Sequence, residues 1–281
     1  MSRPLSLPAP AKLNRMLHIT GRRADGYHEL QTLFQFLDHG DTLHFTPRTD
    51  GRIRLIPDIP GVAHDANLIV RAAQRLQALA APSRGIDITL DKRLPMGGGL
   101  GGGSSNAATT LLALDRLWQL ELGEERLAAI GVELGADVPV FVRGFAAWGE
   151  GVGERLQPAP LDTPWFVVVH PGVSVSTGAL FNHPELTRQT PSISMARALQ
   201  GGRNDCEPVA RRLQPSVGVA IDWLKHFGAA MMTGTGSCVF CPLPDCSAAT
   251  EVMQETGRQH PQWQTFMAQG CNISPLHVAL K

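Results

Sequence analysis

The sequence has no excess charge of either sign and no long apolar run. Lysine plus arginine and aspartate plus glutamate both count 25 in 281 residues, so the formal net charge is zero. Such a chain has no overall field to attract nucleic acid or anionic lipid. No segment is apolar over the length of a bilayer, and the N-terminal segment lacks the apolar core of a signal peptide. We therefore expect a soluble, cytoplasmic protein that binds neither nucleic acid nor membrane.

Cysteine is also scarce, with five residues in the chain. An odd number at low density argues against a disulfide framework and for reduced thiols in the cytosol. Cys238 and Cys241 form a lone C-x-x-C in a strand-like run, and no second pair is present to complete a zinc site. We interpret these thiols as core residues.

Glycine, in contrast, is concentrated at one point. Six of the thirteen residues at 94–106 are glycine, a density that indicates a loop whose backbone takes positive φ or lies close to another group. Ser104, Ser105 and Asn106 then provide N-cap chemistry, and an apolar helical run follows at 107–120. Free N–H groups and the positive end of the helix dipole would face one point, which predicts a phosphate-binding loop.

Two known phosphate-binding patterns fit this loop poorly. A Walker loop needs lysine directly after its last glycine, whereas the residue after Gly103 is serine. A dinucleotide fingerprint fits Gly97, Gly99 and Gly102 by letter, after an expected strand at 86–90, but the acidic residues at the required distance lie on or just after the helix. A flexible linker is the other alternative, although linkers rarely lead directly into a capped apolar helix.

The N-terminal region is expected to form a strand at 9–19. Leu13, Leu17 and Ile19 alternate onto one face of this strand. Lys12 and Asn14 share the opposite face. From spacing alone, a solvated strand face is the simplest interpretation of these two polar residues.

An Asp-Gly pair at 25–26 predicts a hairpin turn into a second strand at 30–37. Tyr27, the only tyrosine in the chain, lies at this turn, where a lone aromatic residue is usually a partly buried anchor. The following segments would extend the hairpin into an antiparallel meander: a turn at 38–41 and strands at 42–46 and 52–56.

Two polar residues carry helix-start chemistry. Asn67 begins an amphipathic helix that extends to residue 80. A further helix at 124–134 ends at a glycine, after which Asp137, followed by Val-Pro, is expected to be the N-cap of a next helix. A carboxylate at a helix N-terminus is held in its ionised form. Asp137 could therefore accept a proton at neutral pH.

The chain is expected to divide into two halves near a proline-rich segment at 158–164. We place an N-terminal domain at 1–155 and a C-terminal domain at 156–281. The second half opens with a buried strand at 165–170 and contains a glycine-rich hairpin at 231–240.

Three separated segments resemble the motifs of the GHMP kinases, a family named for galactose, homoserine, mevalonate and phosphomevalonate kinases. Residues 10–14, Pro-Ala-Lys-Leu-Asn, resemble the first motif, and the glycine loop with its helix start resembles the second. Residues 231–240 resemble the third. The resemblance implies an α+β, two-lobed GHMP kinase fold. Its active site would lie in the cleft between an N-terminal nucleotide-binding half and a C-terminal half.

The resemblance also implies a role for individual residues. Lys12 would lie beside the acceptor hydroxyl, and Asp137, in Gly-Ala-Asp-Val-Pro, would be the catalytic aspartate. The residues implied to bind ATP and its phosphates are Asn67, Pro95, Met96, Gly97, Gly98, Gly99, Leu100, Gly101, Gly102, Gly103, Ser104 and Ser105. Lys92, at the lip of this loop, is a further candidate because a basic residue suits a polyphosphate, although such a charge is more often merely solvated. Those implied to bind the acceptor are Asn14, Tyr27, His28, Thr177 and Phe181.

Residues 25–28, Asp-Gly-Tyr-His, resemble the branch of the family whose acceptor carries a cytosine ring. The resemblance implies ATP-dependent phosphorylation of the 2-hydroxyl of a cytidine diphosphate-linked methylerythritol, in the non-mevalonate route to isoprenoid precursors. Mg²⁺ would bridge the ATP phosphates, with the hydroxyl of Ser104 or Ser105 as a candidate ligand and no clear carboxylate partner. The chain is expected to be a monomer or a homodimer.

Two alternatives stay open. Another GHMP kinase with a small acceptor would need no aromatic residue at position 27. A non-catalytic nucleotide sensor would keep the glycine loop but would need neither Lys12 nor Asp137, and both are present.

Overall fold

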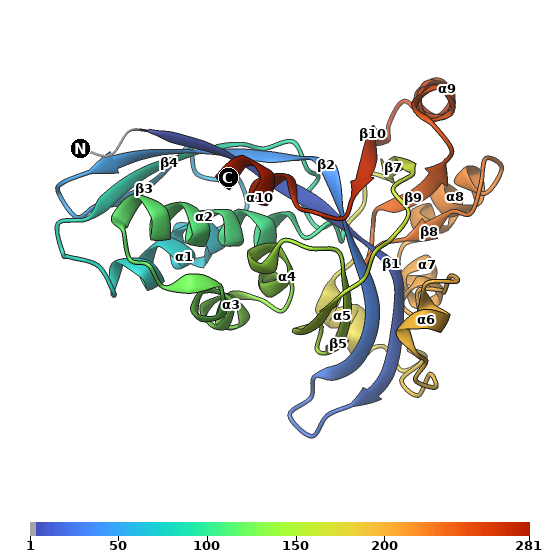
Figure 1. Cartoon of the computed structure of the whole chain (residues 1–281). Helices are drawn as coiled ribbons and strands as arrows, with labels where there is room; N and C mark the ends of the chain where they lie inside the picture. The colour runs from blue at the N-terminus through green and yellow to red at the C-terminus, as the bar shows by residue number, and fades with distance from the viewer. Residues whose placement is uncertain (1–3) are drawn as a thin grey trace.

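The computed structural model of the chain describes residues 4–281. Its ten strands form one continuous sheet in the order β3-β4-β2-β10-β7-β9-β8, with β1 and β5 paired to β2, and β6 paired to β5 (Figure 1). The elements are β1 (Leu5–Arg22), β2 (His28–Arg48), β3 (Ile53–Ile56), α1 (Leu68–Gln77), β4 (Gly85–Asp91), α2 (Gly102–Trp118), α3 (Gly123–Leu134), α4 (Val138–Arg143), β5 (Ala147–Gly151), β6 (Arg155–Pro158), β7 (Trp165–His170), α5 (Thr177–Asn182), α6 (Met195–Ala198), α7 (Glu207–Leu213), α8 (Pro215–Leu224), β8 (Met231–Met232), β9 (Val239–Leu243), α9 (Cys246–Gln259), β10 (Gln264–Cys271) and α10 (Pro275–Leu280). The α+β fold class is confirmed.

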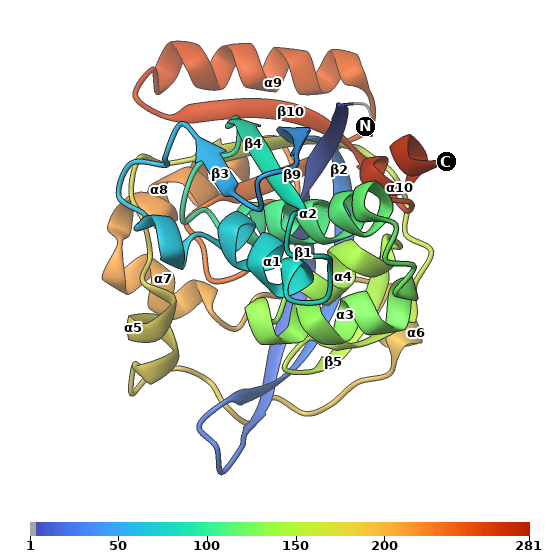
Figure 2. The same ribbon diagram turned by 90° about the vertical axis from the view of Figure 1, so that its left-hand side faces the viewer.

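A long hairpin of β1 and β2 forms the centre of the sheet, and its turn projects from the body of the molecule (Figures 1 and 2). The turn expected at 25–26 is confirmed, and Gly26 has φ 91° there. The turn expected at 38–41 is wrong, because β2 runs through these residues to Arg48. Instead, the register shifts between Pro10 and Lys12. A side chain at Gly40 would meet the Ala9 carbonyl oxygen at 2.2 Å, so the glycine permits close contact between the strands.

The antiparallel meander is also wrong. β3 pairs with β4 in parallel, with Ile53 opposite Ile86, while β4 pairs with β2 antiparallel. The connection from β3 to β4 contains α1, and a crossover of that length allows parallel pairing, as a two-residue turn does not. This arrangement makes β4 the strand that leads into the glycine loop.

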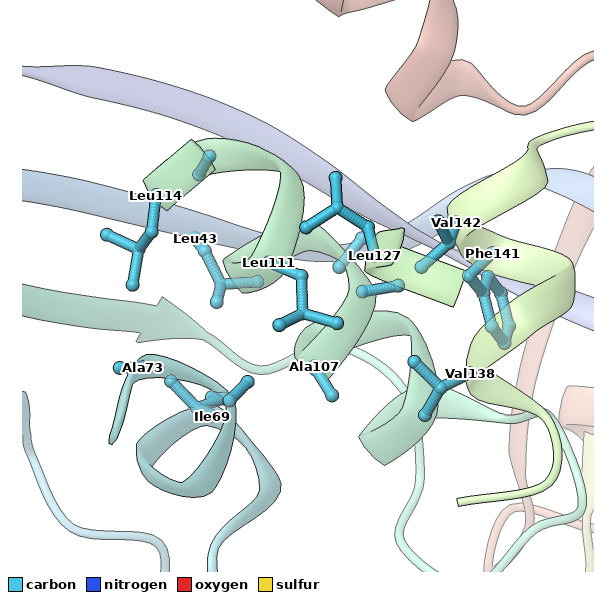
Figure 3. Close-up of a cluster of buried hydrophobic side chains, with 14 of the residues drawn as sticks. Leu43, Ile69, Ala73, Ala107, Leu111, Leu114, Leu127, Val138, Phe141 and Val142 are labelled. Carbon is cyan, nitrogen blue, oxygen red and sulfur yellow. The ribbon is translucent and has the colours of Figure 1, made fainter. Parts of the chain in front are cut away.

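The helices α1 to α4 cover one face of the N-terminal sheet. Figure 3 shows Leu43 of β2 among side chains of α1 and α2. Leu111 of α2 lies between Leu43 and the side chains of α4. Most residues of α2 are buried, including Ala107 and Leu114. Because α2 is enclosed on several sides, its N-terminus and the glycine loop are fixed against the sheet.

The second half packs a separate apolar cluster between β7, β9 and the helices α5, α7, α8 and α9. Figure 2 shows α9 lying along β10. β10 pairs with β2 at Gly270–Leu37, and Leu276 of α10 is buried in the first core, so the chain returns to the N-terminal half. The division after residue 155 falls inside β6, which pairs with β5. The two-domain boundary stays a prediction.

None of the helices within residues 4–281 is long and apolar enough to cross a membrane. The N-terminal segment is expected to lack a signal peptide, and its first three residues lie outside the described residues. All five cysteines are free, and Cys238 and Cys241 are buried. Burial raises the pKa of the Cys241 thiol to about 11, which keeps it protonated and supports its interpretation as a core residue.

We expect folding stability to fall as pH decreases from 7 to 5. Burial is the largest cause of a lowered pKa at five histidines, which are His18, His28, His39, His170 and His277. Below pH 6.5 the unfolded chain therefore binds protons that the folded chain does not, so the free energy of unfolding decreases until the folded-state pKa values are passed. Thermal melts between pH 7 and 5, above the range where carboxylates titrate, would measure this. A constant or rising melting temperature would contradict it.

Candidate active site

A cleft of about 960 Å³ lies between the two halves of the chain. Nineteen of the twenty residues expected to bind or act on a substrate line this cleft, from Lys12 on β1 to Phe181 on α5. The exception is Ser105, which is fully buried. Segments far apart in the sequence thus converge on one site.

The glycine loop enters α2 through residues with positive φ. Gly97, Gly99 and Gly101 have φ of 67°, 75° and 71°. Gly101 occupies the N-cap position, so Ser104 and Ser105 already lie in the first helical turn. The expected serine N-cap is wrong, because the left-handed Gly101 starts the helix several residues earlier. The first N–H groups of the helix have no intrahelical acceptor, and the residues that carry them line the cleft.

The hairpin of β8 and β9 packs directly against this loop. The backbone N–H groups of Ser237 and Cys238 donate to the carbonyl oxygens of Gly97 and Gly98 at 3.2 and 3.0 Å. A side chain at Gly99 would meet the Thr233 carbonyl oxygen at 2.3 Å. The shape of the loop therefore depends on direct contact between the two glycine-rich segments.

A buried carboxylate fixes the entry to the loop. Asp41 of β2 accepts hydrogen bonds from Lys92 Nζ at 2.8 Å, from the N–H groups of Arg93 and Leu94, and from Asn106 Nδ2. Lys92 also donates to the Leu94 carbonyl, so its ammonium is held beside the start of α2. Asp41 was missed by sequence reasoning, because a turn was expected at this position.

Lys12 and Asp137 form an ion pair at the centre of the cleft. Lys12 Nζ lies 3.1 Å from Asp137 Oδ2, 2.6 Å from Asn14 Oδ1 and 3.1 Å from the Gly99 carbonyl oxygen. Lys12 is only 2% exposed. A solvated face for Lys12 and Asn14 is therefore wrong, since the glycine loop covers this face of β1.

Asp137 immediately precedes α4, as the N-cap prediction requires, but its side chain accepts no N–H from that helix. One third of the side chain is exposed in the cleft. The carboxylate can thus contact both Lys12 and a bound hydroxyl group.

One end of the cleft carries aromatic residues. The rings of His28 and Phe181 stack with centroids 4.9 Å apart and an interplanar angle of 24°. Tyr27 is 63% exposed on the projecting hairpin turn, so its interpretation as a partly buried anchor is wrong. Thr177 shares a hydrogen bond with Thr235 at 3.0 Å. Burial and the nearby Arg188 lower the pKa of His28, which keeps its ring neutral at pH 7.

The other end of the cleft is apolar. Ile59, Val62 and Leu68 line it, and Leu68 lies beside the first turn of α2, 3.6 Å from where a side chain at Gly103 would be. Met96, 48% exposed, projects from the glycine loop. Asn67 also lines this region and caps α1 by accepting from the Ile69 N–H at 2.9 Å. Sequence reasoning missed Ile59 and Val62, which lie in an irregular segment without periodicity.

The chain matches known proteins along most of its length. The pattern described as the GHMP kinases N terminal domain matches residues 67–145, and that of the GHMP kinases C terminal matches residues 187–261. A protein of Chromohalobacter salexigens named 4-diphosphocytidyl-2-C-methyl-D-erythritol kinase is 68% identical, over 98% of this chain and 94% of its own. A protein of the same name from Pseudomonas aeruginosa is 57% identical, over 100% and 99%.

Solved structures show the same relationship. A crystal structure of 4-(cytidine 5'-diphospho)-2C-methyl-D-erythritol kinase matches with a TM-score of 0.82 and 34% identity, covering 95% of this chain and 99% of that one. A Methanococcus jannaschii mevalonate kinase shares the fold at a TM-score of 0.69 and 16% identity, with 97% and 99% coverage. The family matches and the named relatives make this chain a small-molecule kinase. The chain belongs to the GHMP kinase family.

Proposed function

We propose that this chain transfers the γ-phosphoryl group of ATP to the 2-hydroxyl of 4-diphosphocytidyl-2-C-methyl-D-erythritol, a step of the non-mevalonate route to isoprenoid precursors. The observation that carries the proposal is the position of the Lys12–Asp137 pair between a phosphate loop and an aromatic end. The names of relatives at 57–68% identity support it. The free cysteines and the absence of a membrane-spanning helix in residues 4–281 fit a cytoplasmic location.

The ATP phosphates would bind at the N-terminus of α2. Phosphoryl transfer depends mainly on positioning and on compensation of charge. The N–H groups of the loop and the dipole of a seventeen-residue helix supply both at this end of the cleft. The apolar surface near Leu68 would accommodate the adenine ring.

Asp137 would accept the proton of the acceptor hydroxyl, and Lys12 would compensate negative charge between the acceptor and the γ-phosphoryl oxygens. The ion pair orients the carboxylate. Asn14 holds the ammonium from the other side through its Oδ1, while its Nδ2 donates to Thr32 at 2.8 Å. The Lys12 ammonium is thus held between Asp137 and Asn14.

Mg²⁺ is compatible with this site but would be held mainly by ATP. No group of three or more metal-binding side chains occurs in the part of the chain that the structure describes. Mg²⁺ is commonly bound through one or two carboxylates together with substrate phosphates. Ser105 Oγ is buried without a hydrogen-bond partner among residues 4–281, and Ser104 lines the cleft. Ser104 and Asp137, which line the cleft, are the candidate protein ligands, whereas Ser105 does not reach it. The ion would neutralise phosphate charge.

The experiment that tests the proposed function is ADP release in the presence of ATP and a panel of acceptors. We expect turnover with the cytidine diphosphate-linked methylerythritol and none above background with homoserine, mevalonate or galactose. Turnover with one of the small acceptors alone would support a different GHMP kinase. No turnover with any of them, together with tight ATP binding, would support a nucleotide sensor.

Substitution of Tyr27 distinguishes a kinase for the cytidine diphosphate-linked acceptor from a GHMP kinase with a small acceptor. We expect Tyr27→Ala to raise the acceptor KM about tenfold, because stacking on a base contributes roughly 1–3 kcal/mol. Tyr27→Phe should retain most of the affinity, since the ring remains. The ATP KM and the melting temperature should be unchanged, because Tyr27 is exposed. An unchanged acceptor KM in Tyr27→Ala would argue against stacking at this position.

A further inference from the structure

Arg188 holds the ring of His28 and the segment that carries Phe181. Its Nε donates to His28 Nε2 at 3.2 Å. Its Nη2 donates to the carbonyl oxygens of Phe181 and His183 at 2.9 and 2.8 Å, and its Nη1 donates to that of Leu186 at 3.1 Å. The guanidinium therefore has a fixed orientation, with one N–H directed at the imidazole.

This contact determines where the imidazole proton lies. The guanidinium of arginine can only donate, so His28 Nε2 must present its lone pair. The neutral ring then carries its hydrogen on Nδ1. His28 lines the cleft, and Nδ1 has no hydrogen-bond partner within residues 4–281, so its N–H is available to a ligand.

The charged groups around the His28 ring also favour its neutral form. Arg188 and Arg22, which lies opposite His28 on β1, are the charged groups that face it. Both lower its pKa, after the larger effect of burial. A proton on His28 Nε2 would also face the Arg188 Nε–H, so two donors would point at each other.

We propose that Arg188 is a specificity-determining positioning residue, which fixes His28 as the Nδ1–H tautomer and thereby as a hydrogen-bond donor to the base of the acceptor. The inference rests on the proposed function. A cytosine ring offers acceptor atoms at N3 and O2, and these require a donor. The Nε2–H tautomer would place a lone pair on Nδ1 and repel the same atoms.

Kinetics of Arg188→Met test the effect on the acceptor. We expect the acceptor KM to rise at least about fivefold at pH 8, corresponding to one lost or weakened hydrogen bond, with kcat and the ATP KM within about twofold. Arg212→Met is the matched control, because Arg212 is exposed and pairs with Glu185 outside the cleft. Arg188→Lys retains a charge and a donor, and should recover part of the affinity.

The pH profile separates this role from simple support of the segment at 181–188. In Arg188→Met the pKa of His28 should rise towards 6.5, because a positive charge beside the ring is lost. The protonated ring carries hydrogen on both nitrogens, so its Nδ1–H is restored as pH falls. The ratio of the acceptor KM of the variant to that of the wild type should therefore shrink between pH 8 and pH 6. A purely structural role would raise the acceptor KM by the same factor at every pH. A constant ratio would therefore overturn the proposal.

Long-range proton–nitrogen NMR of the free protein provides a readout that does not depend on the substrate. The His28 signals would be assigned by their loss in His28→Asn. We expect the proton on Nδ1 in the wild type and a mixture of tautomers in Arg188→Met. A proton on Nε2 in the wild type, or an ordinary His28 pKa, would overturn the inference even if the kinase activity is established. If NMR showed the proton on Nδ1 but the protein did not phosphorylate the acceptor, only the proposed function would be contradicted.

Discussion

Asp137→Asn is expected to lower kcat by about 10²–10⁴-fold, the usual contribution of a general base. Asparagine keeps the size of the side chain but cannot accept the hydroxyl proton. Both KM values should change little, because the phosphate loop and the aromatic end remain in place. The melting temperature should also change little, since one third of the Asp137 side chain is exposed. Steady-state kinetics with both substrates, alongside thermal melts, would measure this.

Glu133→Gln is the matched control for this substitution. Glu133 is an exposed carboxylate on neighbouring α3 that pairs with Arg75 outside the cleft, so the same chemical change there should leave kcat unaltered. Lys12→Met should lower kcat by a factor similar to Asp137→Asn. The double variant should be little slower than either single variant, because residues that act as a unit are not additive. Normal turnover in Asp137→Asn would refute its role as proton acceptor.

Gly99→Ala is expected to damage both the phosphate loop and the fold. Gly99 has φ 75°, where a residue with a side chain is strained, and the added methyl group would lie 2.3 Å from the Thr233 carbonyl oxygen. We expect a loss of at least about 2 kcal/mol in the free energy of unfolding. Displacement of the loop by about 1 Å should lower kcat/KM for ATP roughly 100-fold. Chemical denaturation and ATP-dependent kinetics would measure the two effects.

Gly103→Ala is the control for stability in the same segment. Gly103 lies in the first turn of α2 without positive φ, and a side chain there would meet only Leu68 Cδ1 at 3.6 Å. Alanine should therefore leave the free energy of unfolding unchanged or slightly raised. If Gly99→Ala were as stable as Gly103→Ala, the close contact between the loop and the β8–β9 hairpin would not hold in solution.

The parts of the fold that sequence reasoning predicted are those with local signals. The hairpin turn at 25–26, the Asn67 cap and the helix ending at Gly135 each depend on residues adjacent in the chain. Asp38, Gly40 and Asp41 are residue types typical of turns, so the sequence predicts a turn at 38–41. In the structure, however, Asp41 is buried and receives hydrogen bonds from the entry to the glycine loop.

The parts of the site that could not be predicted depend on tertiary contacts. Polarity alone does not show that Lys12 is buried, because the residues that cover it are far away in the sequence. Likewise, the contact between Arg188 and His28 joins residues 160 positions apart. The resemblance to the GHMP kinases is what predicts that Lys12 and Asp137 belong to the same active site. The structure places them 3.1 Å apart.

In the proposed reaction the Lys12–Asp137 pair lies between the γ-phosphate of ATP and the acceptor hydroxyl. A crystal structure with a non-hydrolysable ATP analogue, Mg²⁺ and the cytidine diphosphate-linked acceptor tests it most directly. We expect the phosphates at the N–H groups of residues 97–104, the cytosine ring beside Tyr27 and Phe181, and the 2-hydroxyl within hydrogen-bond distance of Asp137. Phosphates bound away from this loop, or an acceptor hydroxyl out of reach of Asp137, would contradict it.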